Sequence, residues 1–194
     1  KDAIALSLKE LPLGTGVLEP IDNMTLPSSI RDGSPDAWGR RVIMNRVFGK
    51  QNADGQYADL DEMTYLLESG SDRIGAFDFQ ASATEYVPRV SRAATLEELL
   101  EAASLVEKGI ALTPELDQAL NHGTSIGGAR PKALIESAGA KYVAKFSASN
   151  DRVNVVKNEF IAMRLAEKCG IDVARVALEQ ALGKDILLIE RFDR

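Results

Sequence analysis

The stretch from residue 132 to residue 192 constrains the fold most, because two pairs of strand-like runs surround one helix-like run. "KALIES" and "AKYVAKFSA" are joined by Ser-Ala-Gly, which is typical of a β-hairpin. "VARVALEQAL" and "KDILLIERF" predict a strand, a turn at Gly183 and a second strand. Residues 154–169 lie between these pairs and predict a helix that ends at Gly170. The region from about residue 121 onward therefore predicts a β-sheet packed on one helix.

The first 120 residues predict mostly helices with some strands. Residues 1–31 lack a helical period and predict short strands and turns, and "IGAFDFQ" alternates like another strand. The predicted helices share capping residues at their starts: Ser34 before Pro35, Asp59 with Glu62, Thr95 with Glu98, and Thr113 before Pro114. Gly49, Gly70 and Gly109 predict the ends of the first three. The fold class is therefore α+β.

Composition narrows the class of protein. The 194 residues carry 23 Lys and Arg against 29 Asp and Glu, a formal net charge of −6, which argues against a large nucleic-acid footprint. A single cysteine, Cys169, excludes an intrachain disulfide framework and fits a reducing compartment such as the cytoplasm. We expect it to be a small core residue. The sequence has no apolar run long enough for a membrane span and no visible signal peptide.

Lys145 and Glu159 are charged residues in largely apolar elements. Strand alternation places Lys145 on the face opposite Ala144 and Phe146. The neighbours of Glu159 at helical spacings are apolar: Val155, Ala162, Met163 and Ala166. A buried carboxylate needs a partner, because burying an unpaired charge is very costly. We therefore expect Lys145 to pair with Glu159, although a purely structural ion pair fits the same pattern.

A glycine-rich segment, "NHGTSIGGARPKALI", precedes the first of these strands. Gly123 and Gly128 have the spacing of a Walker A loop, but Ala129-Arg130 stands where Lys-Ser/Thr is needed, and G-x-G-x-x-G is absent. The glycine signal alone is therefore weak. Glycine loop, strand lysine, helix glutamate and a final strand nevertheless follow in the order found in the ATP-binding lobe of a protein kinase.

Several segments together resemble one family, the HipA-like serine/threonine kinases, which are toxins of toxin–antitoxin pairs. The resemblance rests on "TSIGGARPKALI", "YVAKF", "NEFIAMRLAEKCGIDVA" and "IERFDR", in that order. "LPSSIRDGSPDAWGRR" and "SDRIGAFDF" look like the amino-terminal region of the family. The resemblance implies a HipA-type amino-terminal subdomain at residues 1–120. Residues 121–194 would form a kinase-like small lobe up to the hinge.

The resemblance also implies roles for individual residues. Ser125 matches the serine that the family phosphorylates on itself, which expels the loop and inactivates the kinase. Lys145 matches the ATP-contacting lysine, and Glu159 matches the residue that positions it. The nucleotide-binding loop matches Gly127, Gly128, Ala129, Arg130, Pro131 and Lys132, and the adenine-binding hinge matches Glu190, Arg191 and Phe192. Each of these residues also has a simpler interpretation. Ser125 could be only a turn residue, and Arg130 and Lys132 could belong to a solvated loop. Arg191 could be a surface side chain.

The family's catalytic aspartate, its neighbouring asparagine and its magnesium ligand lie in a helical carboxy-terminal lobe. That lobe would begin after Arg194, so the resemblance implies no catalytic residue and no metal ligand in this chain. The intact protein would use ATP and Mg²⁺ and pair with a DNA-binding, HipB-like antitoxin, meeting DNA only through it. Its substrate would be a protein, with an aminoacyl-tRNA synthetase as the well-known target in the family.

Two other functions stay open at the level of sequence. A truncated relative would bind nucleotide or a partner without transferring phosphate. An unrelated α+β domain would use the glycine segment only as a turn and would bind no nucleotide.

Overall fold

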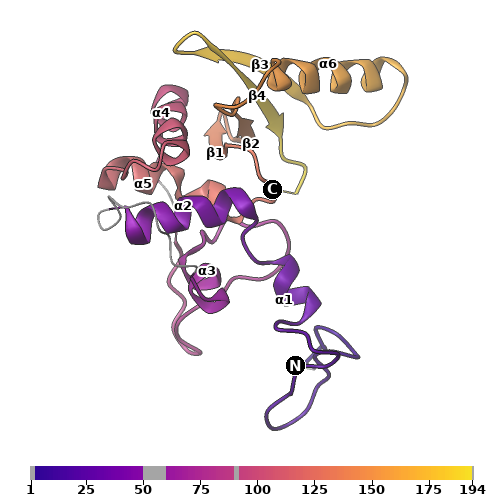
Figure 1. Ribbon diagram of the computed structural model, residues 1–194. Helices are drawn as coiled ribbons and strands as arrows, with labels where there is room; N and C mark the ends of the chain where they lie inside the picture. Colours follow the sequence, from indigo (N-terminus) through magenta and orange to yellow (C-terminus); the bar gives the residue numbers. More distant parts are fainter. Residues whose placement is uncertain (1–2, 50–59, 90–91, 194) are drawn as a thin grey trace.

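A computed structural model describes residues 3–49, 60–89 and 92–193. The described elements, in chain order, are α1 (Ser28–Asp32), α2 (Ala37–Phe48), α3 (Glu62–Glu68), α4 (Leu96–Glu107), α5 (Pro114–Leu120), the 3-10 helix η1 (Asn121–Ser125), β1 (Lys132–Ser137), β2 (Ala140–Lys145), α6 (Val155–Lys168), β3 (Val176–Ala181) and β4 (Lys184–Glu190). The chain is therefore α+β, as the sequence predicts. Figure 1 shows α2 to α5 on one side of the strands and α6 on the other.

The four strands form one antiparallel sheet in the order β1-β2-β4-β3. Both hairpins turn through two residues with positive φ, Ala138-Gly139 and Leu182-Gly183. This backbone matches the right-handed twist of the flanking strands. In the register, Lys132 lies opposite Lys145, and Tyr142 lies opposite Glu190. The strand–strand–helix–strand–strand order predicted from residue 132 onward is confirmed.

A single hydrophobic cluster joins the helices to the sheet. Its largest helical members are Trp38 on α2, Leu99 and Leu100 on α4 and Leu120 on α5, and Phe146 just after β2 is in the same cluster. All four strands contribute to the cluster, through Ala133, Ala144, Ala181 and Ile186. Because the cluster draws residues from both sides of residue 120, the two predicted subdomains share one core, and the boundary between them stays a prediction.

Helix capping follows the sequence in three places. Thr95 and Glu98 form the predicted capping box of α4, and Thr113 caps α5 with Pro114 at its first position. Gly49 follows α2 as predicted. Helix α2 starts later than predicted, because Asp36 and not Ser34 is its N-cap residue. For α3, the predicted cap Asp59 lies outside the described residues, and Asp61 caps the helix by accepting from Thr64 N.

Three other expectations fail in whole or in part. The turns predicted within residues 1–31 are present among residues 3–26, but instead of strands this part has an isolated bridge between Ser7 and Leu11. The segment lies beyond α1 at the far end from the sheet (Figure 1). Residues 74–80 form no strand, because side chains rather than a backbone ladder hold this segment. Cys169 is exposed and not in the core. No helix among the described residues has the length and apolarity that crossing a bilayer requires.

Candidate functional site

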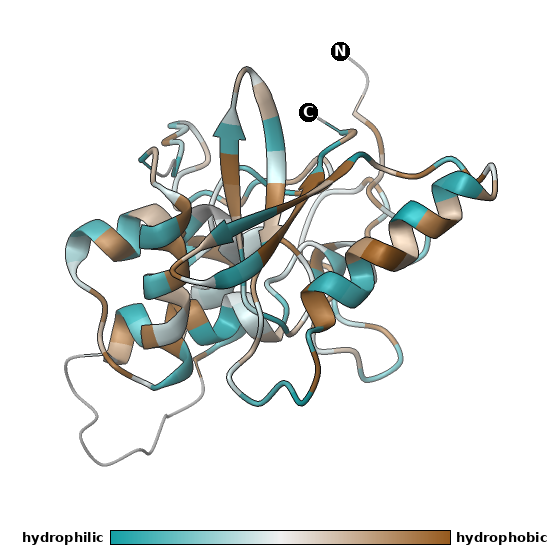
Figure 2. Cartoon of the chain, turned by 90° about the horizontal axis from the view of Figure 1, so that it is seen from above, coloured by the Kyte–Doolittle hydropathy of each residue, from teal (hydrophilic) through white to brown (hydrophobic). Residues whose placement is uncertain are grey.

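Lys145 and Glu159 form the predicted ion pair. The Lys145 Nζ lies 2.6 Å from Glu159 Oε1, joining the end of β2 to the second turn of α6. Both side chains are partly exposed, so the expectation of a buried carboxylate is wrong. The reason is that α6 rests on the sheet by little of its surface: of its residues, all described, Val156 alone is buried. Figure 2 shows hydrophobic and hydrophilic residues mixed along this helix.

Lys132 is the unexpected member of the site. It lies directly opposite Lys145 in the β1–β2 register, so both lysines leave the same face of the sheet. Like charges at such a position, with Cβ atoms about 4.5–5.5 Å apart, destabilise a sheet. Lys132 is only 3% exposed, and its Nζ has no hydrogen-bond partner among the described residues. Burial, helped by the charge of Lys145, lowers the pKa of Lys132 to about 8.

The glycine segment passes over this lysine. Gly128 has φ of +107°, in the region that favours glycine, and a Cβ there would lie 2.9 Å from Lys132 Nζ. Gly127, Gly128 and Ala129 are exposed. The next side chain, Arg130, pairs with Asp151 in the turn before α6. The loop thus brings an exposed backbone, a buried ammonium and the Lys145–Glu159 pair together on one face of the sheet.

The predicted hinge residues lie at the other end of β2. Glu190 ends β4 opposite Tyr142, three residues along the strand from Lys145, which corresponds to about 10 Å. Phe192 follows with a ring that is 95% exposed. Arg191 differs from the expected surface residue, because its side chain is only 3% exposed.

Arg191 is buried against Asp72, which is distant in sequence, and also pairs with the nearby Asp193. Its guanidinium lies 2.9 Å from Asp72 Oδ1 and 2.8 Å from Asp193 Oδ2, and Lys141 Nζ holds the other Asp72 oxygen at 2.7 Å. Burial alone would raise the pKa of Asp72, but the Lys141 hydrogen bond and the Arg191 charge bring it below its ordinary value. The Arg191 guanidinium is therefore engaged with Asp72 and Asp193 and holds the end of β4 against the Asp72 turn.

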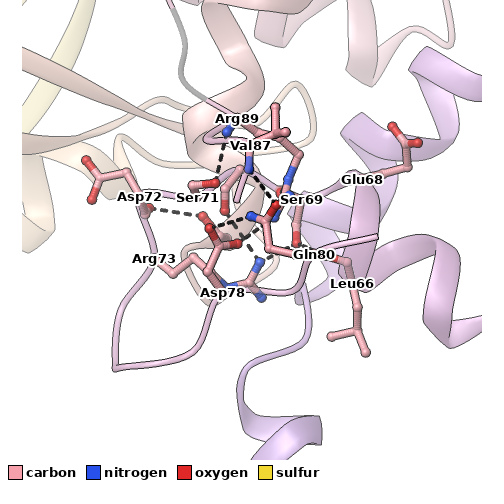
Figure 3. A network of polar contacts seen from close by, with 12 residues as sticks. Leu66, Glu68, Ser69, Ser71, Asp72, Arg73, Asp78, Gln80, Val87 and Arg89 are labelled. Atoms are coloured by element: carbon pink, nitrogen blue, oxygen red, sulfur yellow. Dashed lines mark hydrogen bonds and ion pairs between the residues drawn. The ribbon is translucent and has the colours of Figure 1, made fainter. Parts of the chain in front are cut away.

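Ser125 ends η1 and connects to the same acidic residue. Its Oγ donates to the Asp72 carbonyl oxygen at 3.1 Å, and the side chain is partly buried. Figure 3 shows the turn that carries Asp72, with Arg73, Asp78 and Arg89 around it. Asp78 and Arg89 pair at 2.5 Å and hold this turn to the segment that follows. The glycine segment and the hinge are therefore anchored on one turn of the amino-terminal region.

A groove of about 720 Å³ borders the glycine segment, lined by Ser125 and Gly127 together with residues of α1 and the start of α2. Sequence reasoning missed the residues that reach the site from this region, Asp36, Trp38 and Asp72. Local patterns give no signal for them, because each meets the site across at least 50 residues of chain. Among the described residues, no group of three or more His, Cys, Asp or Glu side chains is arranged to hold a metal ion.

Comparison with protein families identifies this region. Residues 124–194 match the model described as the HipA-like C-terminal domain. A search of curated proteins gave no match. The match covers the glycine segment from Thr124 onward, the four-stranded sheet, α6 and the predicted hinge residues, and the resemblance seen in the sequence is confirmed over residues 124–194.

Proposed function

Residues 124–194 are a HipA-like domain, and on that premise we propose that this chain is the nucleotide-binding part of a HipA-like, ATP-dependent serine/threonine protein kinase. The whole protein transfers the γ-phosphate of ATP to a serine or threonine of a protein and acts as a growth-inhibiting toxin. It pairs with a HipB-like antitoxin. The ATP site comprises residues 127–132 of the glycine segment, Lys145 and the hinge at residues 190–192.

One observation carries this proposal: the Lys132 ammonium lies buried and without a hydrogen-bond partner beneath the glycine segment, opposite Lys145. An unpartnered buried charge is costly, and a second positive charge across the strand adds to that cost. A bound anion relieves both. Phosphate oxygens fit, because the exposed turn at Gly127 and Gly128 passes directly over this ammonium, and glycine turns of this kind can present backbone N–H groups to an anion.

The remaining geometry supports a nucleotide over a simple anion. Glu159 engages Lys145 and leaves its ammonium at the end of β2, which suits a group that orients phosphates. The hinge lies about 10 Å away along the same pair of strands, with the exposed Phe192 ring beyond it. An adenine at the hinge with its phosphates at the glycine segment spans this distance. Mg²⁺ would accompany the phosphates.

The first test is binding of a non-hydrolysable ATP analogue by titration calorimetry. Lys145→Met should weaken binding at least tenfold, about 1.4 kcal/mol, because the ammonium is lost. Lys157→Met is the matched control: this α6 lysine also pairs with a carboxylate, Asp185 at 3.1 Å, but is not in the proposed site. Unchanged affinity in Lys145→Met would refute the role of Lys145.

Kinase activity needs a separate test in cells. Expression of the full-length protein should arrest growth, and Lys145→Ala should abolish this effect at equal expression. Retained toxicity would contradict the kinase assignment. Analogue binding without transfer of labelled γ-phosphate would instead favour a non-catalytic module derived from such a kinase.

An aminoacyl-tRNA synthetase is the first protein substrate to assay. Phosphate on Ser125 after incubation with ATP would support self-inhibition through the glycine segment.

A further inference from the structure

The first turn of α2 holds the glycine segment by its backbone. Asp36 is the N-cap residue of α2, yet its side chain caps no N–H group of its own helix. Its Oδ2 instead accepts from Gly128 N at 2.6 Å. Trp38 N–H, a donor that helix starts leave without an internal partner, donates to the Gly128 carbonyl oxygen at 3.2 Å. Gly128 is therefore held on both its donor and its acceptor side.

A third bond fixes the other end of the segment. The indole Nε1 of Trp38 donates to the Lys132 carbonyl oxygen at 2.8 Å, and the Trp38 side chain is fully buried. The three residues between Gly128 and Lys132 thus bridge two anchor points on the same helix turn. Any ligand that meets this bridge meets a backbone whose ends are fixed by α2.

The two glycines fit between a carboxylate and an ammonium. A Cβ on Gly127 would lie 2.9 Å from Asp36 Oδ2, and a Cβ on Gly128 would lie 2.9 Å from Lys132 Nζ. Asp36 also acts electrostatically on Lys132, where its negative charge favours the ammonium form. Asp36 thereby sets both the path of the glycine backbone and part of the field around the buried lysine.

We propose that Asp36 is the positioning residue of the glycine segment. Its carboxylate fixes the Gly128 N–H so that the loop stays over Lys132. Asp36 acts through Gly128 and contacts no reacting atom. The role of Asp36 in fixing the loop does not depend on the proposed function. The expected effect of Asp36 on nucleotide affinity does rest on the proposed function.

Two variants separate the loop bond from the stability of the helix. Asp36→Ser places a favourable N-cap residue at the start of α2, so the helix start is not weakened, but the short side chain no longer reaches Gly128. Asp36→Asn keeps a carbonyl oxygen that accepts the Gly128 N–H and removes only the charge. Asp32→Ala is the control, because Asp32 lies on α1 in the same groove.

Backbone ¹⁵N relaxation of the purified protein without nucleotide reads out the loop directly. The Gly128 order parameter should be about 0.85 in the wild type, in Asp36→Asn and in the control, and below about 0.6 in Asp36→Ser. An unchanged order parameter in Asp36→Ser overturns the proposal. Equal loosening in Asp36→Asn overturns it too, because the hydrogen bond would then not be the cause.

Nucleotide titration adds the functional consequence. Asp36→Ser should bind the ATP analogue at least tenfold more weakly than the wild type, whereas Asp36→Asn should stay within a few-fold. If Asp36→Ser loosens Gly128 but binds as tightly as the wild type, positioning for nucleotide is refuted. If the wild type binds no nucleotide at all, the proposed function fails, and the relaxation result alone decides the role of Asp36.

Discussion

Replacing Lys132 by methionine should stabilise the protein while weakening the proposed phosphate binding. The folded state lowers the pKa of Lys132 from an ordinary 10.5 to about 8, because the ammonium is buried and faces Lys145. Each unit corresponds to about 1.4 kcal/mol, so holding the charge at pH 7 costs the folded state on the order of 3 kcal/mol. Methionine fills similar space without charge or an unsatisfied donor.

Urea unfolding at two pH values tests this estimate. At pH 7, Lys132→Met should be more stable than the wild type by up to about 3 kcal/mol, and exposed Lys184→Met should change stability by less than about 0.5 kcal/mol. A lowered lysine pKa means that the unfolded chain binds more protons than the folded protein above pH 8. Wild-type stability should therefore rise between about pH 8 and pH 10, and the gap to Lys132→Met should close. The reasoning would be refuted if Lys132→Met were less stable than the wild type at pH 7. It would also be refuted if the difference in unfolding free energy between the two proteins did not change with pH.

Two further substitutions probe how the site is anchored. Arg191→Met leaves the Asp72 carboxylate buried with one cation fewer, while Lys141 still pairs with it. We therefore expect a loss of unfolding free energy of about 3 kcal/mol, the low end for a broken buried pair. The exposed control Arg164→Met should cost under about 0.5 kcal/mol in the same urea titration. Equal losses would contradict the buried network. Gly39→Ala places a Cβ against the Thr124 carbonyl and should lower stability by about 1–3 kcal/mol, despite the better helix propensity of alanine. Gly14→Ala, where a Cβ meets no atom within 4 Å, is the control in thermal melts. A stabilised Gly39→Ala would contradict the close packing of α2 on η1.

Local patterns predicted the parts of the site that lie close together in sequence. The Lys145–Glu159 pair follows from strand alternation and helical spacing over 14 residues, and the hairpins follow from their glycine turns. The burial of residues on α6 was harder to predict from the sequence. Helical spacing shows which residues share a face, but not how much of that face the sheet covers. Glu159 is accordingly paired as predicted but only partly buried.

Distant contacts explain what the sequence did not indicate. Arg191 is buried because Asp72, 119 residues away, faces it. Ser34 looks like an N-cap, yet its hydroxyl bonds to Glu62, and the helix starts where Asp36 can reach Gly128. Such partners become visible only once the chain is folded.

The alternation at residues 74–80 shows the same limit for a strand. Alternation describes side-chain pattern, whereas a strand needs a neighbouring backbone to pair with. Here Asp78 pairs with Arg89, and the Gln80 side chain accepts from Val87 N at 3.0 Å. Side-chain contacts, and not strand pairing, therefore hold this segment in place. No strand of the described sheet lies beside it.

Phosphate binding beneath the glycine segment is tested most directly by calorimetric titration of the wild type and Lys132→Met with a non-hydrolysable ATP analogue between pH 7 and pH 9. The Lys132 ammonium, with a pKa of about 8, should be required. We therefore expect wild-type affinity to fall as pH rises through 8, and Lys132→Met to bind at least tenfold more weakly at pH 7 with little dependence on pH. Equal affinity of the two proteins at pH 7, or a wild-type affinity that is flat across this range, would contradict a phosphate site at Lys132.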